Sequence, residues 1–164
     1  MKQINAIGNK IYTLPALLAT ILGWRIKGQT IAFTNGCFDI LHEGHIFSLS
    51  QAAKEADLLI VGINSDASTK RLKGDERPVN NQQSRALIMA SLAIVDAVVI
   101  FEEDTPLNLI ENILPDVLVK GGDYTIAQIV GAEEVIANGG KVVINPIVQG
   151  FSTTGIIEKI RKLG

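Results

Sequence analysis

The sequence predicts a doubly wound α/β domain, in which helices cover both faces of a parallel sheet of five strands. Five short apolar runs rich in β-branched residues show no alternation with polar residues, which is typical of strands buried on both faces of a parallel sheet. A helical pattern follows each run, and strict alternation of strand and helix builds a doubly wound sheet.

Strands and helices alternate along the chain from Thr30 onward. The predicted strands are Thr30–Thr34, Leu58–Asn64, Ala97–Phe101, Val117–Lys120 and Lys141–Asn145. The predicted helices span residues 43–55, 82–94, 106–114 and 126–138, with a last helix from Thr153 to the C-terminus. Thr105 is expected to cap the third of these helices, with Pro106 at its first position, and Pro115 ends it. Asn138-Gly139-Gly140 ends the next helix.

The bulk composition bounds the class of protein. A chain of 164 residues, 47% hydrophobic and 20% charged, is long enough for one domain with a substantial core, so we expect a single domain over residues 1–164. Residues 1–27 are expected to form a helical extension, because residues 14–26 are apolar but lack the basic leader and cleavage site of a signal peptide. The net charge of −2 argues against a general nucleic-acid or membrane-surface binder.

Cysteine content and hydropathy indicate the compartment. Cys37 is the one cysteine, which excludes an internal disulfide and fits a reducing environment. No apolar run approaches the roughly 20 residues that span a bilayer. The sequence therefore predicts a cytoplasmic protein.

The most informative segment runs from Phe33 at the end of a strand to His45. His42 and His45, three positions apart at the start of a helix, share one face, where free backbone N–H groups and the helix dipole favour an anion. Gly44 between them allows a close approach. Zinc is the main alternative, but no third ligand stands at an obvious spacing. Asp39 is expected either to cap the helix or to contact the ligand.

A basic segment, residues 66–78, follows the second strand. Lys70, Arg71, Lys73 and Arg77 fall within eight positions of an otherwise slightly acidic chain. We expect a long loop that acts as a flap, with Lys73 or Arg77 over the phosphates. The alternative is a solvated run of charges. Arg85, in the next helix, is expected to add a cation or to pair with an acidic neighbour.

Two later strand ends complete the predicted site. Gly121-Gly122, flanked by Lys120 and Asp123, allows backbone to approach a flat ligand. Ser152-Thr153-Thr154 opens the last helix, where hydroxyls and free N–H groups form a second phosphate cradle. Two helix starts and a basic flap at one edge of the sheet predict a ligand the size of a triphosphate.

These residues resemble the nucleotidyltransferase superfamily of cytidylyltransferases and their adenylyltransferase relatives, which share HxGH after the first strand and an S/T-rich start of the last helix. Within it the chain is similar to the heptose 1-phosphate adenylyltransferases, on the segments TNGCFDILHEGH, INSDASTKRLKGDERPVN, FEEDTP, ILPDVLVKGGDY and GFSTTGIIEKI. The resemblance implies a Rossmann-like nucleotidyltransferase fold. It also implies conversion of ATP and D-glycero-D-manno-heptose 1-phosphate to ADP-heptose and pyrophosphate, with Mg²⁺ held mainly by the ATP phosphates and a homodimer as the assembly.

The resemblance also implies residue roles. His42, His45 and Lys73 are the expected catalytic residues, as stabilisers of charge on the phosphates. The nucleotide is expected to contact Cys37, Phe38, Gly44, Gly121, Gly122, Asp123, Ser152, Thr153 and Thr154. The sugar phosphate is expected to contact Asn64, Arg71, Arg77 and Lys120.

Two departures from the cytidylyltransferase pattern favour ATP over CTP. Pro146-Ile147-Val148 stands where those relatives place an arginine, and Cys37 stands where they tend to have threonine. Bifunctional relatives carry a sugar-kinase domain ahead of this one, so we expect a stand-alone transferase that needs a separate kinase and phosphatase. A glycerol-3-phosphate cytidylyltransferase, another sugar-phosphate nucleotidyltransferase and a non-catalytic nucleotide-binding module are the alternatives.

Overall fold

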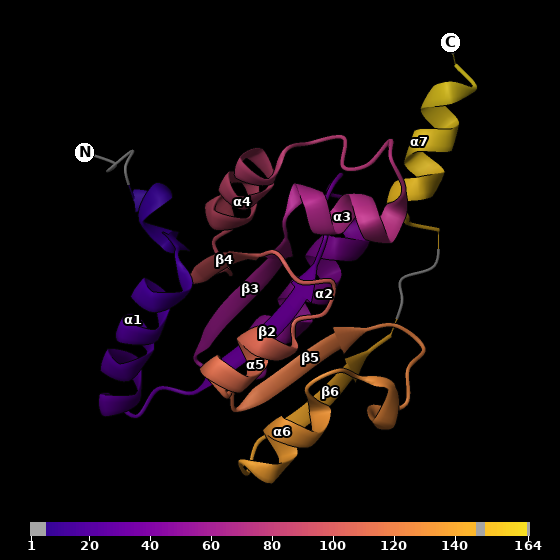
Figure 1. The fold of residues 1–164 in the computed structure, drawn as a ribbon. Coiled ribbons are helices and arrows are strands. Elements are labelled where there is room, and N and C mark those ends of the chain that lie inside the picture. The colour runs from indigo at the N-terminus through magenta and orange to yellow at the C-terminus, as the bar shows by residue number, and fades with distance from the viewer. Residues whose placement is uncertain (1–5, 147–149, 164) are drawn as a thin grey trace.

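The computed structural model describes residues 6–146 and 150–163. Its centre is a sheet of six parallel strands in the order β1-β4-β3-β2-β5-β6. Figure 1 shows β2 in the interior of this sheet, between β3 and β5. The strands are β1 (Ile11–Tyr12), β2 (Ile31–Gly36), β3 (Leu58–Asn64), β4 (Ala97–Phe101), β5 (Val117–Gly121) and β6 (Lys141–Asn145). The parallel α/β class is confirmed, and the expected count of five strands is one too low.

The additional strand is β1, at the edge of the sheet. Ile11 and Tyr12 pair with Val98 and Val99 of β4. Two residues are too short for a strand pattern to be recognised in a sequence. The segment predicted as a helical extension thus contributes both a strand and a helix to the domain.

The helices cover both faces of the sheet. They are α1 (Leu14–Ile26), α2 (Glu43–Ala53), α3 (Asp66–Lys73), α4 (Gln82–Ser91), α5 (Leu107–Ile113), α6 (Ala132–Ala137) and α7 (Thr153–Arg161), with short 3-10 turns η2 (Gly8–Lys10) and η3 (Ile126–Gln128). Buried residues of α1, α5 and α6 share one core cluster, and those of α2 and α4 share the other. Since each cluster packs helices against the same sheet, helices lie on both of its faces, which is the doubly wound arrangement.

The basic segment differs most from the expectation. Residues 66–73 form α3 rather than a long loop, because the Ser65 hydroxyl caps the helix by accepting the backbone N–H of Ser68. The irregular part is limited to residues 74–81. The polar residues that suggest a loop in the sequence are the cap and the exposed face of a helix.

Two other helix boundaries differ from the sequence patterns. The pattern over 126–138 divides into η3 and α6, since Gly131 adopts a left-handed φ of 86° between them. Pro106, not Thr105, occupies the cap position of α5, and no side chain caps that helix. Neither change moves an element away from its face of the sheet.

The strand order places the ligand-binding edge. β2 pairs with β3 along one edge and with β5 along its other edge. From β2 the chain adds β3 and β4 in one direction and then β5 and β6 in the opposite direction, so the strand order reverses at β2. Crevices beyond the carboxyl ends of strands at such a point are where open α/β sheets bind ligands. The histidine segment follows β2 directly.

Candidate active site

The histidine segment turns sharply between β2 and α2. β2 ends at Gly36, and Phe38 adopts a left-handed φ of 47°, which is uncommon for a side-chain-bearing residue. His42 occupies the cap position of α2, and its ring stacks on that of His45 with 3.8 Å between centroids. The Phe38 ring meets His45 edge-on at 5.4 Å. The prediction that the two histidines share one face is confirmed.

The two imidazoles are held in their neutral form. Burial lowers the pKa of His42, and burial together with the neighbouring His42 lowers the pKa of His45 to about 4. The Nδ1 atoms of both rings are buried, with no hydrogen-bond partner among the described residues. An orphaned buried N–H is costlier than an orphaned lone pair, which favours the tautomer with the proton on Nε2. Each ring then offers an Nε2–H donor to a ligand.

Gly44 sets the position of the His42 ring. A Cβ at residue 44 would lie 3.2 Å from His42 Nδ1, 3.3 Å from its Cε1 and 3.2 Å from the Cβ of Phe151. The Phe151 ring in turn lies parallel to His42, with 6.4 Å between centroids. The imidazole therefore packs between the start of α2 and the residue two positions before α7.

A cavity of about 680 Å³ opens at the carboxyl edge of the sheet, and a smaller one of about 280 Å³ adjoins it. The larger cavity is lined by these residues of the predicted site: Cys37, Phe38, His42, His45, Asn64, Lys73, Arg77, Lys120, Ser152, Thr153 and Thr154. The smaller one reaches Gly44 and Gly121. Segments that follow β2, β3, β5 and β6 in the sequence thus meet around one space.

Two lysines from different elements line the larger cavity. Lys120 at the end of β5 lies 3.4 Å from Asn35 Oδ1, and burial lowers its pKa. Lys73 in the last turn of α3 makes no ion pair with another described residue. Both charges can serve a ligand.

Arg77 and Asp39 neutralise each other at the cavity wall. Arg77 Nε lies 2.6 Å from Asp39 Oδ2, and the Asp39 carboxylate also accepts the backbone N–H groups of Val79 and Asn80. Burial of Asp39 opposes its ionisation, but the backbone donors and Arg77 outweigh it and lower its pKa. Asp39 does not cap α2, so the capping role expected for it is wrong. It fixes the loop after α3 against the turn after β2.

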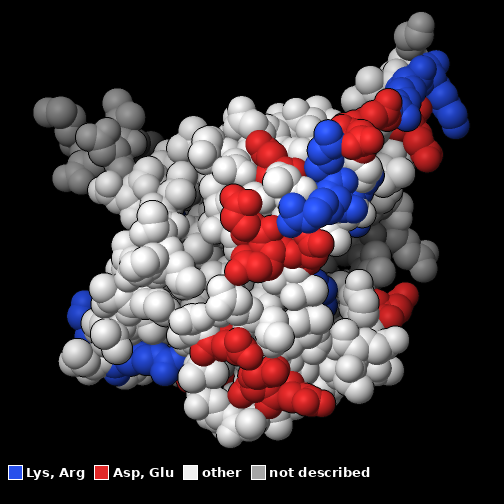
Figure 2. Space-filling view, in the orientation of Figure 1, with Lys and Arg blue, Asp and Glu red and all other residues white. Residues whose placement is uncertain are grey.

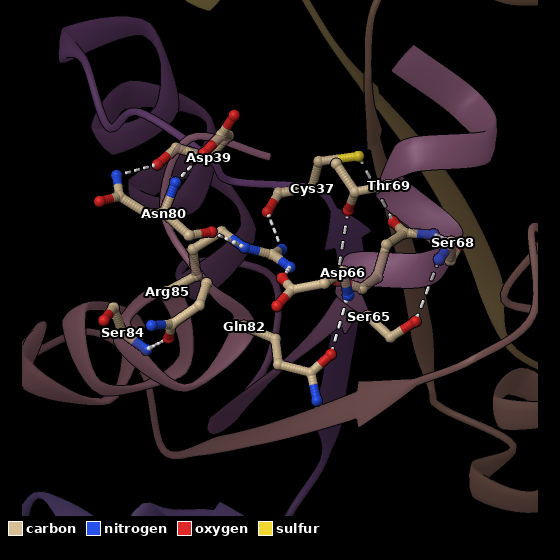
Figure 3. Close-up of polar contacts among 12 residues, drawn as sticks. Cys37, Asp39, Ser65, Asp66, Ser68, Thr69, Asn80, Gln82, Ser84 and Arg85 are labelled. Carbon is tan, nitrogen blue, oxygen red and sulfur yellow. Dashed lines mark hydrogen bonds and ion pairs between the residues drawn. The ribbon is translucent and has the colours of Figure 1, made fainter. Parts of the chain in front are cut away.

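Arg85 joins three parts of the site, as Figure 3 shows. Its side chain is fully buried and donates to the carbonyl oxygens of Cys37 (2.5 Å) and Asn80 (3.0 Å) and to Asp66 Oδ1 (2.8 Å). The turn after β2, the start of α3 and the loop after α3 therefore share one anchor. Of the two roles expected for Arg85, pairing with an acidic neighbour is the one observed.

Hydrogen bonds fix the side chain of Asn64 at the end of β3. Its Nδ2 donates to Ser68 Oγ (3.0 Å), whose hydroxyl donates to the Glu103 carbonyl (2.9 Å). Because the Ser68 hydroxyl donates its proton to the Glu103 carbonyl, its oxygen accepts the hydrogen bond from Asn64 Nδ2. Asn64 Oδ1 is then the acceptor that faces the site, where the Cys37 thiol donates to it at 3.9 Å.

Some predicted residues lie apart from the cavity or have other partners. Arg71 bonds to Asp104 and to the Glu102 carbonyl on the exposed side of α3, and neither cavity is lined by Arg71, Gly122 or Asp123. At the start of α7, the Ser152 hydroxyl caps the helix and Thr153 Oγ1 donates to the Ile40 carbonyl. Of the segment Pro146-Ile147-Val148, the last two residues lie outside the described residues.

Sequence reasoning missed part of the cavity wall. Asp104 and Thr105 line it, and neither was among the predicted site residues. Both follow β4, whose carboxyl end lies at the same edge as those of β2 and β3. Because ligands of open α/β sheets bind beyond the carboxyl ends of the strands, the position of these two residues after β4 could have indicated that they line the site.

The sheet order and a cavity at its carboxyl edge define the class, a Rossmann-like domain. The model of the family described as "Cytidylyltransferase-like" matches residues 33–159, and the chain belongs to this family of nucleotidyltransferases. The chain is similar to proteins named "Bifunctional protein HldE". One from Mesorhizobium japonicum is 57% identical over 86% of this chain and 28% of its own length. One from Rhodospirillum rubrum is 50% identical over 97% of this chain and 32% of its own length. The chain therefore spans about a third of the length of these relatives.

Two solved structures share the fold. A lipopolysaccharide core biosynthesis protein from Thermoplasma volcanium matches with a TM-score of 0.61 and 28% identity, over 74% of this chain and 98% of its own. A pantoate-beta-alanine ligase from Francisella tularensis matches with a TM-score of 0.61 over 93% of this chain and 77% of its own. Its 18% identity supports the fold alone.

Proposed function

We propose that the chain is an adenylyltransferase that converts ATP and D-glycero-D-manno-heptose 1-phosphate to ADP-heptose and pyrophosphate. The observation that carries the proposal is the stacked His42–His45 pair in a cavity lined by two lysines that form no ion pair with a described residue, within a chain of this family. High identity to the HldE relatives over most of the chain supports a role in ADP-heptose synthesis. Similarity to the lipopolysaccharide core biosynthesis protein of Thermoplasma supports a related biosynthetic role.

The proposed reaction is a direct transfer. A phosphate oxygen of the heptose 1-phosphate attacks the α-phosphorus of ATP, the new P–O bond forms as the bond to the bridging oxygen of the β-phosphate breaks, and pyrophosphate carries away the electron pair. The attacking phosphate is already ionised, so the step depends on positioning and on stabilisation of charge rather than on a base. The Nε2–H groups of His42 and His45 would donate to the α-phosphate and the departing pyrophosphate, and Lys73 would add a full charge.

The remaining cavity residues would divide between the two substrates. The nucleotide would contact Cys37, Phe38, Gly44 and Gly121, with the α7 start at its phosphates. The sugar phosphate would contact Asn64, Arg77 and Lys120. Asn64 suits a sugar hydroxyl rather than a phosphate, because the atom it presents is an acceptor.

Mg²⁺ would be held mainly by the ATP phosphates, where it neutralises charge on the pyrophosphate. Among the described residues, no group of three or more His, Cys, Asp or Glu side chains is placed to hold a metal ion. Of the acidic residues that line the larger cavity, Asp39 is paired with Arg77 and Asp104 with Arg71. The homodimer and the cytoplasmic location stay predictions from the sequence.

The test is pyrophosphate release with ATP or CTP and a panel of sugar phosphates that includes glycerol 3-phosphate. We expect release with ATP and heptose 1-phosphate, and a loss of at least about 10²-fold in turnover for His45→Ala, with an unchanged melting temperature. A preference for CTP with glycerol 3-phosphate would replace the proposed activity with the cytidylyltransferase. ATP binding without pyrophosphate release for any acceptor would identify a binding module.

A further inference from the structure

The outer face of α1 is apolar and uncovered. The inner face packs Leu17 and Ile21 into the core, at 0% and 4% exposure. The opposite face presents Pro15, Ala19, Leu22 and Ile26, at spacings of four, three and four residues, with Leu22 64% and Ile26 87% exposed. A helix that is apolar on all sides is normally buried on all sides. An exposed apolar stripe of this kind marks a surface that docks onto something.

The segment of the chain that contains α1 carries basic residues but no acidic ones. The first acidic residue of the protein is Asp39, so residues 1–38 contain none of its 17 acids but carry Lys2, Lys10, Arg25 and Lys27. In Figure 2 the rim formed by α1 is white, with blue where the helix ends, whereas red patches lie over the middle of the molecule. The net charge of −2 therefore hides a basic, apolar segment on a more acidic body.

The C-terminal end of α1 keeps the positive charges of Arg25 and Lys27. Arg25 Nη2 donates to the carbonyl oxygens of Ile113 and Leu114, which fixes the guanidinium without neutralising it. Lys27 follows directly after the helix and is exposed, with no ion pair to a described residue. The partner of this face is therefore apolar at the stripe and anionic beside it.

A second copy of the chain fits this face poorly. Two α1 helices packed against each other would place two segments without acidic residues side by side, so neither helix would supply an ion-pair partner for the Arg25 or Lys27 of the other. A helix of 13 residues is also only about 20 Å long, so its contact strip falls far below the roughly 800 Å² per partner of a stable interface. A lipid surface needs no such matched area, since each apolar side chain contributes as it is buried.

We propose that the outer face of α1 docks onto an anionic phospholipid bilayer, with Leu22 and Ile26 in the interfacial region and Lys27 at the headgroups. The helix would lie in the plane of the interface, because about 20 Å is shorter than the ~30 Å hydrocarbon core. Among the residues that the structure describes, no helix is both long and apolar enough to cross a membrane. The proposal holds whatever reaction the domain catalyses.

Cosedimentation of the full chain with vesicles tests this docking. We expect binding to phosphatidylcholine vesicles that contain phosphatidylglycerol, little binding to phosphatidylcholine alone, and weaker binding as salt is raised. The double variant Leu22→Gln/Ile26→Gln should bind at least about tenfold more weakly, and Lys27→Gln about fivefold. Glutamine keeps the helix, because it is a good helix former.

The matched control is Leu87→Gln/Ile88→Gln, which changes two exposed apolar residues of α4, on the other face of the sheet, at 51% and 40% exposure. Its vesicle binding should equal that of the unchanged protein. Absence of binding to anionic vesicles, or equal binding by the Leu22→Gln/Ile26→Gln variant, would overturn the proposal. A dimer in solution that this variant alone dissociates would assign the face to a second copy instead.

Discussion

Gly44→Ala separates the position of the His42 ring from the stability of the fold. Residue 44 lies in the first turn of α2, where alanine is a better helix former than glycine by up to about 1 kcal/mol. The added Cβ would meet His42 Nδ1 at 3.2 Å and Phe151 Cβ at 3.2 Å, so the neighbours must move by a few tenths of an ångström. The variant should therefore fold normally while its His42 ring is displaced.

The size of the displacement sets the expected loss. A misplacement of about 1 Å in an active site costs on the order of 10²-fold in rate. A few tenths of an ångström at one of two histidines should then lower kcat roughly three- to tenfold, with a smaller change in the KM for ATP. Pyrophosphate release under saturating substrates measures kcat, and thermal denaturation measures stability.

Gly23→Ala is the matched control, because a Cβ at residue 23 of α1 meets nothing within 4 Å. It should leave kcat unchanged and raise the melting temperature slightly. Wild-type kcat for Gly44→Ala would refute the argument that the Gly44 contact positions His42. A large loss of stability in Gly44→Ala would refute the separation of site and fold.

Two further predictions concern stability. Arg85→Met should lower the free energy of unfolding by about 3 kcal/mol, because the carbonyls of Cys37 and Asn80 lose a charged donor. Arg71→Met, which removes a solvent-exposed pair with Asp104, should lower it much less. Equal losses of the two variants in urea denaturation would contradict this. Burial and the neighbouring His42 lower the pKa of His45 from 6.5 to about 4, so the unfolded chain binds more protons than the fold between these pH values. The free energy of unfolding should therefore fall by roughly 1 to 2 kcal/mol as pH drops through that window, because solvent screens the partly exposed ring. His45→Asn should show a shallower pH dependence than the unchanged protein, and identical curves would show that His45 titrates normally in the fold.

The elements with continuous apolar patterns were readable from the sequence. The predicted bounds of β3, β4 and β6 agree with the structure, because strands that pack side chains against a core cluster on each face need unbroken runs of apolar residues. α3 was missed, because its helix depends on the Ser65 cap while its exposed cations resemble a loop. β1 was missed because its two residues gain their pairing only from β4.

The site divides in the same way. Spacing alone predicted that His42 and His45 share a face, since helix geometry is local. No local pattern could show that Asp39 is held by Arg77, or that Arg85 joins Cys37 to Asp66, because those partners lie 38, 48 and 19 residues apart. Which group a long side chain contacts depends on the distances between residues in the folded chain.

Residue types and their order therefore establish the α/β class, the histidine pair at a strand end and the family resemblance, all of which depend on local periodicity and short motifs. The tertiary structure decides which cations remain available: Lys73 and Lys120 line the cavity without an ion pair to a described residue, whereas Arg77 is paired with Asp39 and Arg71 with Asp104. It also decides that one face of α1 is buried and the other exposed, which an evenly apolar helix does not encode. Pairing and burial depend on the sum of distant contacts, and a sequence gives the order of the groups without the distances between them.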